Sequence, residues 1–457
     1  MTSITLSPSQ QKAVEEFRGF LTDDSQHEFL ISGFAGSGKS FLVEYLIQAV
    51  MREHQVARMI DPKATMPRFY FTATTNKAAH VLSEMLGQPT MTAHKMLGLT
   101  LQTDYKTGNQ RLVRKQEPKN LTNSIVFVDE ASMITYELLN FIREGAKQYE
   151  NCKIVYIGDS YQLPPVKETL CPIFLSNLPV NFLTEIQRQV AGSPIIQLST
   201  KYREMLDDHT LDWPKLSSDG HTIFHYTDKD KWFDTIKQSF IQPHHADDLR
   251  VLAWTNQRIR EYNRWIRSLL GHTDDFNYRE IVQTNKPIIN SVGRIMAATD
   301  SMHQILGVRD HEDDGIEGYS ISLQKISNSA HQSIDVSHHN NFSVFQPKNW
   351  KEANDLARGY AKNKKFRQFY RIKEQWADLR PIHAQTVHKA QGSTYRDVFI
   401  DLTNIGKNNK WQEVARLVYV AVTRASHQIH LFGHLPDRYN KKPIINPMEV
   451  FRNAAQS

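Results

Sequence analysis

This 457-residue sequence contains only two cysteines, Cys152 and Cys171, and no long uninterrupted hydrophobic run. Two cysteines cannot build a disulfide framework or a four-cysteine zinc site. No apolar run approaches the ~20 residues that a helix needs to span a bilayer. The first residues show no basic stretch followed by an apolar core, so no signal peptide is evident. We therefore expect a soluble cytoplasmic protein with no membrane partner.

The charge balance is mildly basic, with 55 Lys and Arg residues against 49 Asp and Glu residues and a net charge of +6. Such a balance suits a nucleic-acid partner but does not require one. The chain is long enough for several domains of about 100–200 residues each. Composition alone therefore leaves the function open, and the motifs must decide it.

The segment at residues 33–40 reads GFAGSGKS and matches G-x-x-x-x-G-K-[ST] at every fixed position. Apolar residues at 28–32 predict a strand before it, and those at 41–47 predict a helix after it. Glycines let backbone N–H groups converge on phosphate oxygens, and the helix N-terminus adds partial positive charge. We expect Lys39 to reach the β- and γ-phosphates of ATP and Ser40 to bind Mg²⁺.

A second apolar run, at residues 124–128, is followed directly by Asp129 and Glu130. In a Mg·ATP hydrolysis site, one carboxylate holds the Mg²⁺ shell and the next orients and deprotonates the attacking water. On its own the pair is more typical of a solvated strand end. Together with the loop at 33–40 it favours ATP hydrolysis.

Two further segments carry candidate catalytic side chains. The predicted strand at 153–157 leads into a loop stiffened by two prolines, where Gln162 can hydrogen-bond both a γ-phosphate and a water. Near the C-terminus an apolar run ends close to Arg424, whose planar donor fork suits a transferring phosphoryl group. Taken alone, a surface loop and a structural ion pair would be the alternative interpretations.

Strand and helix signals alternate in two parts of the chain, which predicts an α/β protein with two parallel-sheet units. The expected strands lie at 28–32, 68–72, 124–128, 153–157, 250–254, 397–401 and 428–432. Residues 101–120 are polar, contain a turn signal, and predict a small hairpin insertion. The expected domains are a first motor domain at 1–190, a second motor domain at 191–281 and 381–457, and a β-rich insert with a basic helical end at 282–380.

In this order the motif blocks resemble those of superfamily 1 helicases, in the RecD/Dda-like branch. The resemblance covers roughly residues 6–433 and is weakest at 282–380. It implies two RecA-like motor domains, ATP and Mg²⁺ as cofactors, and 5′→3′ movement on single-stranded DNA with duplex unwinding. It also implies single-stranded DNA and duplex junctions as partners, with other replication or recombination proteins as candidates.

The resemblance also implies roles for individual residues. For ATP binding these are Gln10, Gly33, Gly36, Ser37, Gly38, Lys39, Ser40 and Gly392. For catalysis they are Glu130, Gln162, Arg188 and Arg424, and for Mg²⁺ they are Ser40 and Asp129. For contact with DNA phosphates they are Thr75, Asn76, Thr92, His94, Thr255, Asn256, Thr386 and His388. Many members have proline where Thr74 stands, which predicts a less rigid loop here.

Several alternatives stay open. The same motor fits a single-strand translocase or an RNA helicase. A non-motor P-loop ATPase or kinase is disfavoured by the second βα unit and by Arg424. The 101–120 hairpin is either a strand-separating pin or an ordinary polar hairpin. Four aromatic residues either stack on bases or belong to the core: Tyr136, Trp254, Phe366 and Tyr370.

Overall fold

The computed structural model describes residues 6–63, 65–103, 110–165, 168, 170–185, 193–208, 213–326 and 341–439. Its contacts divide the chain into two units. The first comprises Met1–Ser160, Pro164–Ala191 and Arg267–Ile382, and the second comprises Tyr161–Leu163, Gly192–Ile266 and His383–Ser457. None of the described helices is both long enough and apolar enough to cross a membrane.

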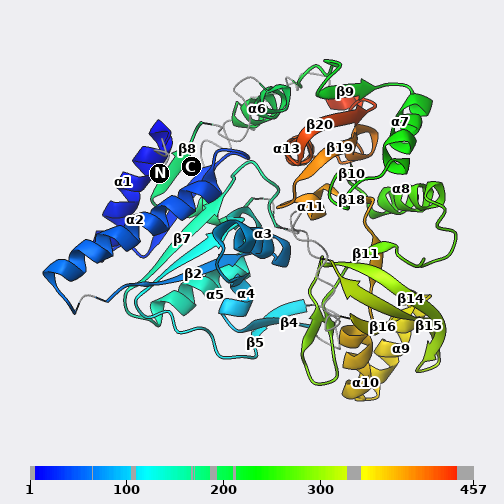
Figure 1. Cartoon of the computed structure of the whole chain (residues 1–457), viewed down its shortest axis with the longest axis horizontal. Helices are drawn as coiled ribbons and strands as arrows, with labels where there is room; N and C mark the ends of the chain where they lie inside the picture. The colour runs from blue at the N-terminus through cyan, green and yellow to red at the C-terminus, as the bar shows by residue number, and fades with distance from the viewer. Residues whose placement is uncertain are drawn as a thin grey trace, which may run out of the picture. The chain divides into compact units, whose positions relative to one another are not determined.

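The first unit contains a six-stranded parallel sheet in the order β3-β2-β6-β7-β1-β8. Figure 1 labels its strands β2, β7 and β8. Its strands are β1 (Glu28–Gly33), β2 (Arg68–Ala73), β3 (Thr90–Thr92), β6 (Ser124–Asp129), β7 (Cys152–Gly158) and β8 (Val180–Leu183). Its helices are α1 (Pro8–Thr22), α2 (Lys39–Ile60), α3 (Asn76–Leu86), α4 (Ala93–Met96) and α5 (Tyr136–Lys147), with short turns η1 (Ala131–Met133) and η2 (Pro172–Leu175).

The central strands of this sheet are apolar throughout because both of their faces are covered. Successive side chains of a strand point to opposite faces. Val126 and Val128 of β6 therefore join one core with α5, whereas Ile125 and Phe127 join another core with α1 and α2. The result is a three-layer α/β/α arrangement, which accounts for the continuous apolar run in the sequence.

The second unit contains a five-stranded parallel sheet in the order β18-β10-β19-β20-β9. Its strands are β9 (Ile223–Tyr226), β10 (Leu249–Ala253), β18 (Ala384–Thr386), β19 (Tyr395–Asp401) and β20 (Ala425–Phe432). Its helices are α6 (Pro194–Asp207), α7 (Lys229–Ile241), α8 (Asn256–Leu269), α11 (Val387–Ala390), α12 (Leu402–Ile405) and α13 (Trp411–Thr423), followed by the turn η5 (Asp437–Tyr439). Helices α6 and α13 pack on one core of this sheet, and Trp232 of α7 stacks against Phe432 of β20.

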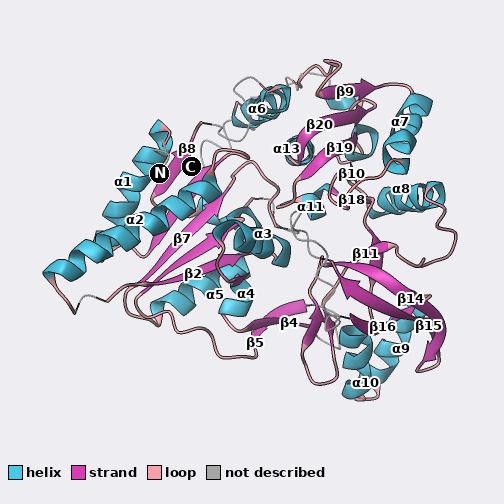
Figure 2. Ribbon diagram, viewed as in Figure 1, coloured by secondary structure: helices cyan, strands magenta, loops and turns pink. Residues whose placement is uncertain are grey.

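The insert forms an antiparallel sheet of its own, in the order β16-β15-β14-β11-β17. Figure 2 shows its strands β11, β14, β15 and β16. Its strands are β11 (Ile281–Thr284), β14 (Met302–Asp313), β15 (Ile316–Lys325), β16 (Asn341–Pro347) and β17 (Leu379–Pro381), with a separate pair β12 (Ile288–Ile289) and β13 (Ile295–Ala297). Helical residues follow β16 in α9 (Trp350–Lys362), α10 (Phe366–Tyr370) and η4 (Arg371–Gln375). The β-rich insert with a helical end is therefore observed.

The predicted hairpin is also observed, as β4 (Leu99–Thr103) paired antiparallel with β5 (Gln110–Arg114). Residues 104–109, at its tip, lie outside the described residues. The predicted fold class is thus confirmed: two parallel α/β sheets, a hairpin insertion and a β-rich insert. The domain boundaries at residues 190, 281 and 380 stay predictions.

One buried histidine in the second sheet predicts a pH-dependent stability. His430 of β20 stacks between Phe224 and Phe399, with ring centroids 4.9 and 4.4 Å away. Burial lowers the pKa of His430 to about 4. Between about pH 6.5 and pH 4 the unfolded chain therefore takes up a proton that the folded chain does not, and stability falls as the pH falls.

Between pH 7 and pH 4.5, we expect the free energy of unfolding to fall by about 2–3 kcal/mol less in His430→Phe than in wild type, because phenylalanine keeps the stack and cannot titrate. Denaturant unfolding of both proteins at pH 7 and pH 4.5 would measure the difference. His427, exposed on the same strand, supplies the control: His427→Gln should keep the wild-type dependence. An identical dependence in wild type and His430→Phe would contradict the assignment.

Candidate nucleotide and strand-binding site

The glycine-rich loop connects β1 to α2 in the first unit, and β1 lies between β7 and β8. Gly36 and Gly38 have φ values of 82° and 80°, in the left-handed region that glycine tolerates and other residues disfavour. Gly38 directly precedes α2 and supplies no side-chain cap. The first N–H groups of α2 therefore stay available, together with the helix dipole, for an anion at the loop.

Close packing explains why glycine is needed at position 33. A Cβ atom there would lie 2.6 Å from Ser37 Oγ and 2.9 Å from Leu183 Cβ. Ser37 Oγ is buried and has no hydrogen-bond partner among the described residues. The Ser37 carbonyl accepts a hydrogen bond from Gln10 Nε2 at 3.4 Å. Gln10 belongs to the capping box of α1, so the first turn of α1 is joined to the loop.

Lys39 and the two carboxylates at the end of β6, Asp129 and Glu130, belong to the same unit. Lys39 Nζ donates to the carbonyl oxygens of Gly33 and Phe34, at 2.6 and 2.9 Å. Burial raises the pKa of Asp129 above its ordinary value, and the positive charge of Lys39 opposes that rise. Asp129 Oδ1 also accepts the backbone N–H of Glu130 at 2.8 Å. Asp129 thus lies close enough to Lys39 to interact with it electrostatically.

Glu130 has an unusual backbone conformation. Its φ of 51° and ψ of 44° lie in the left-handed region, which costs a non-glycine residue on the order of 1–2 kcal/mol. Two hydrogen bonds oppose this strain: the Glu130 carbonyl accepts from Thr74 Oγ1 at 3.2 Å and from the Met133 N–H at 3.0 Å. Thr74, which stands where many members of the family have proline, thus connects the loop after β2 to Glu130.

The predicted strand-contact residues of the first unit stand where strands end and helices begin. Thr75 follows β2 and caps α3, accepting the Ala78 N–H at 3.1 Å. Thr92 ends β3 and caps α4, accepting the Lys95 N–H at 3.2 Å. Asn76, beside Thr75, is exposed. Burial lowers the pKa of His94, with Glu137 opposing the shift, so His94 is neutral near pH 7.

The second unit repeats this arrangement. Thr255 follows β10, precedes Asn256 at the start of α8, and accepts the Arg258 N–H at 3.3 Å. Thr386 ends β18, caps α11, and accepts the Lys389 N–H at 3.4 Å. Burial lowers the pKa of His388, with Glu413 opposing. In both sheets a T-x-H-K segment follows the edge strand and a Thr-Asn pair follows its neighbour.

Gln162 belongs to the second unit although the preceding strand, β7, lies in the first. Its Oε1 accepts a hydrogen bond from Gln391 Nε2 at 3.0 Å, and Gln391 Nε2 also lies 3.2 Å from the Leu163 carbonyl. Arg416 Nη1 donates to the Gln162 carbonyl at 3.0 Å. Within the second unit, Gln162 is therefore joined by hydrogen bonds to Gln391 and to Arg416.

Arg424 and Gly392 come together within the second unit. Arg424 is buried just after α13, and its Nη1 donates to the Ser393 carbonyl at 3.1 Å. Gly392, beside Ser393, has a φ of 72°. Arg188, the other predicted arginine, lies outside the described residues.

Two of the aromatic residues considered for base stacking differ in their exposure. Tyr136 is 55% exposed, whereas Trp254 packs partly buried against the core of the second unit. Two residues were missed as contributors to the site, Thr74 and Gln391. Gln391 directly precedes Gly392, a predicted ATP contact, so its amide was a usable signal. The partner of Thr74 is 56 residues away in the chain, and no sequence pattern indicates it.

Family models match two parts of the chain. Residues 5–221 match an AAA domain, and residues 381–432 match a UvrD-like helicase C-terminal domain. The ATP-dependent DNA helicase dda of Enterobacteria phage T4 is 24% identical over 448 residues, covering 89% of this chain and 94% of the relative. An uncharacterized protein of Acanthamoeba polyphaga mimivirus is 24% identical over 500 residues, covering 92% and 98% of the two chains.

The chain is a superfamily 1 helicase of the RecD/Pif1/Dda-like branch. The predicted family is thereby confirmed, and with it an ATP-dependent, nucleotide-binding enzyme. The fold of this helicase also resembles a Pif1 helicase solved in work on DNA unwinding at forked duplexes, with a TM-score of 0.53, 15% identity, and coverage of 99% and 98% of the two chains.

Proposed function

We propose that this helicase hydrolyses ATP to move 5′→3′ along single-stranded DNA and to separate duplex DNA. The observation that carries this proposal is the repeated arrangement of strand-contact residues: a Thr-Asn pair and a T-x-H-K segment stand at corresponding places in both sheets. Two separate contacts on one strand can step along it when closure around a nucleotide moves them relative to each other.

In this proposal the first unit binds the triphosphate. The loop N–H groups and Lys39 contact the phosphates, and Gln10 contacts the adenine edge. A hydroxyl and a carboxylate, from Ser40 and Asp129, are the oxygen donors that suit Mg²⁺, which neutralises phosphate charge when bound. Glu130 accepts a proton from the attacking water, and the two hydrogen bonds on its carbonyl keep its backbone in one conformation.

Two arginines complete the reaction. Arg424 of the second unit and Arg188 stabilise charge that develops on the transferring phosphoryl group, and Gly392 contacts that phosphate through its backbone. Gln162 contacts the γ-phosphate. Its hydrogen bond with Gln391 couples this contact to the T-x-H-K segment, which begins at Thr386, five residues before Gln391. The domain boundaries predicted from the sequence belong to this proposal, as does the role of the β4–β5 hairpin as a strand-separating pin.

DNA binding is proposed to be tolerant of base sequence, because the contacts come from hydroxyl and amide groups at strand ends. The N-termini of α3 and α8 add backbone N–H groups and a positive dipole end, which favour phosphates. Because such binding releases counterions, its affinity should fall as salt rises.

Strand displacement on duplexes that carry only a 5′ or only a 3′ single-stranded tail tests motor activity, substrate and direction together. We expect displacement with ATP from the 5′-tailed DNA alone. Displacement from the 3′-tailed DNA alone would reverse the direction, and preference for RNA duplexes would favour the RNA-helicase alternative. ATP hydrolysis stimulated by single strands without any displacement would favour a translocase.

A further inference from the structure

The turn that contains Thr255, between β10 and α8, is held by hydrogen bonds from a side chain of a distant segment. Asn404, in the short helix α12 after β19, is buried. Its Oδ1 accepts the backbone N–H groups of Trp254 and Thr255, both at 2.9 Å. Its Nδ2 lies 3.1 Å from Thr255 Oγ1. One amide side chain therefore pairs both backbone donors between the end of β10 and the start of α8, and contacts Thr255, the predicted phosphate contact.

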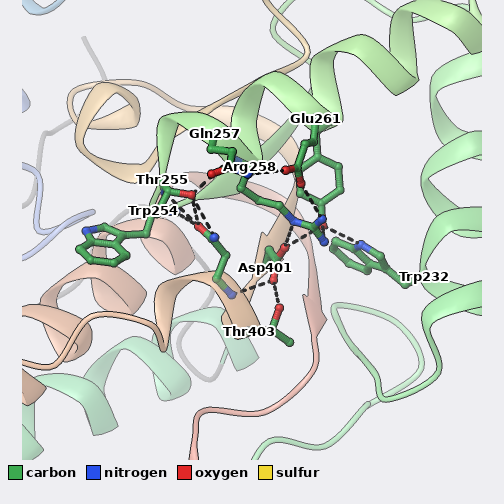
Figure 3. Close-up of polar contacts among 10 residues, drawn as sticks. Trp232, Trp254, Thr255, Gln257, Arg258, Glu261, Asp401 and Thr403 are labelled. Carbon is green, nitrogen blue, oxygen red and sulfur yellow. Dashed lines mark hydrogen bonds and ion pairs between the residues drawn. The ribbon is translucent and has the colours of Figure 1, made fainter.

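Asp401 in turn fixes Asn404. The Asp401 carboxylate is fully buried, and its Oδ1 accepts the Asn404 N–H at 3.0 Å and the Thr403 hydroxyl at 2.5 Å. Its Oδ2 accepts from Arg258 Nε at 2.8 Å and from the Tyr262 hydroxyl at 2.9 Å. Both of these residues belong to α8, so the network of Figure 3 joins the helix, the turn before it and the loop after β19.

The position of Asp401 in the second sheet corresponds to that of Asp129 in the first. Each ends the third strand from the edge, in the orders β3-β2-β6 and β18-β10-β19. Asp129 sits beside Lys39 at the nucleotide loop. Asp401 instead has four hydrogen-bond donors around it and no exposed surface. The carboxylate that serves nucleotide chemistry in one unit is thus used in the other to fix the turn that bears Thr255.

We propose that Asn404 is a positioning residue for the DNA contact at Thr255 and Asn256, with Asp401 fixing its orientation. This inference rests on the proposed function, because it assumes that these two residues bind a strand. Asn404 does not touch DNA in this account. It sets the direction of the Thr255 hydroxyl and of the first N–H groups of α8, so its loss should weaken DNA binding more than the chemical step.

The test measures ATP hydrolysis as a function of the concentration of a single-stranded DNA oligonucleotide. In Asn404→Ala two buried N–H groups lose their acceptor, and we expect the half-saturating DNA concentration to rise about tenfold. The rate of ATP hydrolysis at saturating DNA should change less than about twofold, because the residues proposed to hydrolyse ATP lie elsewhere in the chain. A half-saturating concentration within twofold of wild type would overturn the inference.

Asn408→Ala is the matched control. Asn408 is also a buried asparagine of the second unit, and its Oδ1 also accepts a backbone N–H, that of Lys410 at 2.9 Å. Its removal should lower stability in the same way and leave the half-saturating DNA concentration unchanged. An equal rise in both variants would mean that the effect is general loss of stability and would overturn the inference.

A double-mutant cycle with Thr255→Ala separates positioning from an independent effect. If Asn404 acts through Thr255, the double variant should need no more DNA than the weaker-binding single variant. Fully additive effects would overturn the inference. Should Asn404→Ala fail to fold, Thr403→Val removes one donor to Asp401 and keeps the methyl group. It should raise the half-saturating concentration about two- to threefold, and no change would contradict the network.

Measuring the unaltered chain as well distinguishes failure of the proposed function from failure of the positioning role of Asn404. If its ATP hydrolysis responds to single-stranded DNA and Asn404→Ala behaves like wild type, only the positioning role fails. If the unaltered chain does not respond to single-stranded DNA, the proposed function fails and the inference falls with it.

Discussion

Lys39→Ala is expected to reduce ATP hydrolysis at least about 100-fold, because it removes a charged donor from the phosphates at the moment when their charge shifts. Lys39 begins α2, and its ammonium group already lies among the loop carbonyls of Gly33 and Phe34. It is therefore held at the loop without depending on the second unit. Duplex separation should be lost in proportion, whereas binding of single-stranded DNA should persist, since the residues proposed to contact the strand are elsewhere in the chain.

Steady-state phosphate release and a fluorescence-anisotropy titration with labelled single-stranded DNA would measure the two properties. Lys12→Ala is a suitable control, because Lys12 is an exposed lysine of the same unit that forms an ion pair with Glu16 on the surface of α1. ATP hydrolysis that survives intact in Lys39→Ala would refute the assignment of the loop. Parallel loss of DNA binding would indicate misfolding.

Glu130→Gln is expected to lower the turnover number about 10²–10⁴-fold, the usual contribution of a general base. The substitution keeps the size of the side chain and leaves the carbonyl that Thr74 and Met133 contact. Nucleotide binding should therefore persist, and ATP should accumulate on the enzyme unhydrolysed. Single-turnover hydrolysis together with a nucleotide-binding titration distinguishes this result from loss of affinity.

Glu150→Gln provides the comparison, because Glu150 is exposed and far from the loop in sequence. It should hydrolyse ATP at the wild-type rate. A Glu130→Gln variant that turned over normally would show that another group activates the water. One that no longer bound ATP would show that Glu130 has a structural role in the loop instead.

The long buried strands could be predicted from the sequence almost to the residue. The run expected at 124–128 is β6 (Ser124–Asp129), and the run at 153–157 is β7 (Cys152–Gly158). They were visible because both faces are covered and the apolar signal is continuous. The edge strands β3 and β18 escaped prediction, since each has three residues and depends on pairing with its neighbour, β2 or β10.

The site followed a similar rule. Roles for residues within one contiguous motif, such as Lys39 or Asp129, could be proposed from their neighbours in the chain. Contacts between distant segments could not. Gln162 and Gln391 are 229 residues apart, and Thr255 and Asn404 are 149 residues apart. Their pairing depends on which strands lie side by side, and this order is set by the whole sheet and not by any local pattern.

The central claim is that ATP hydrolysis at the loop depends on a strand bound by both units. Measuring the ATPase rate of the unaltered chain against increasing single-stranded DNA tests it most directly. The account predicts a saturable rise, on the order of tenfold or more, as expected when two binding events are coupled. A rate that stays the same at every DNA concentration would contradict it.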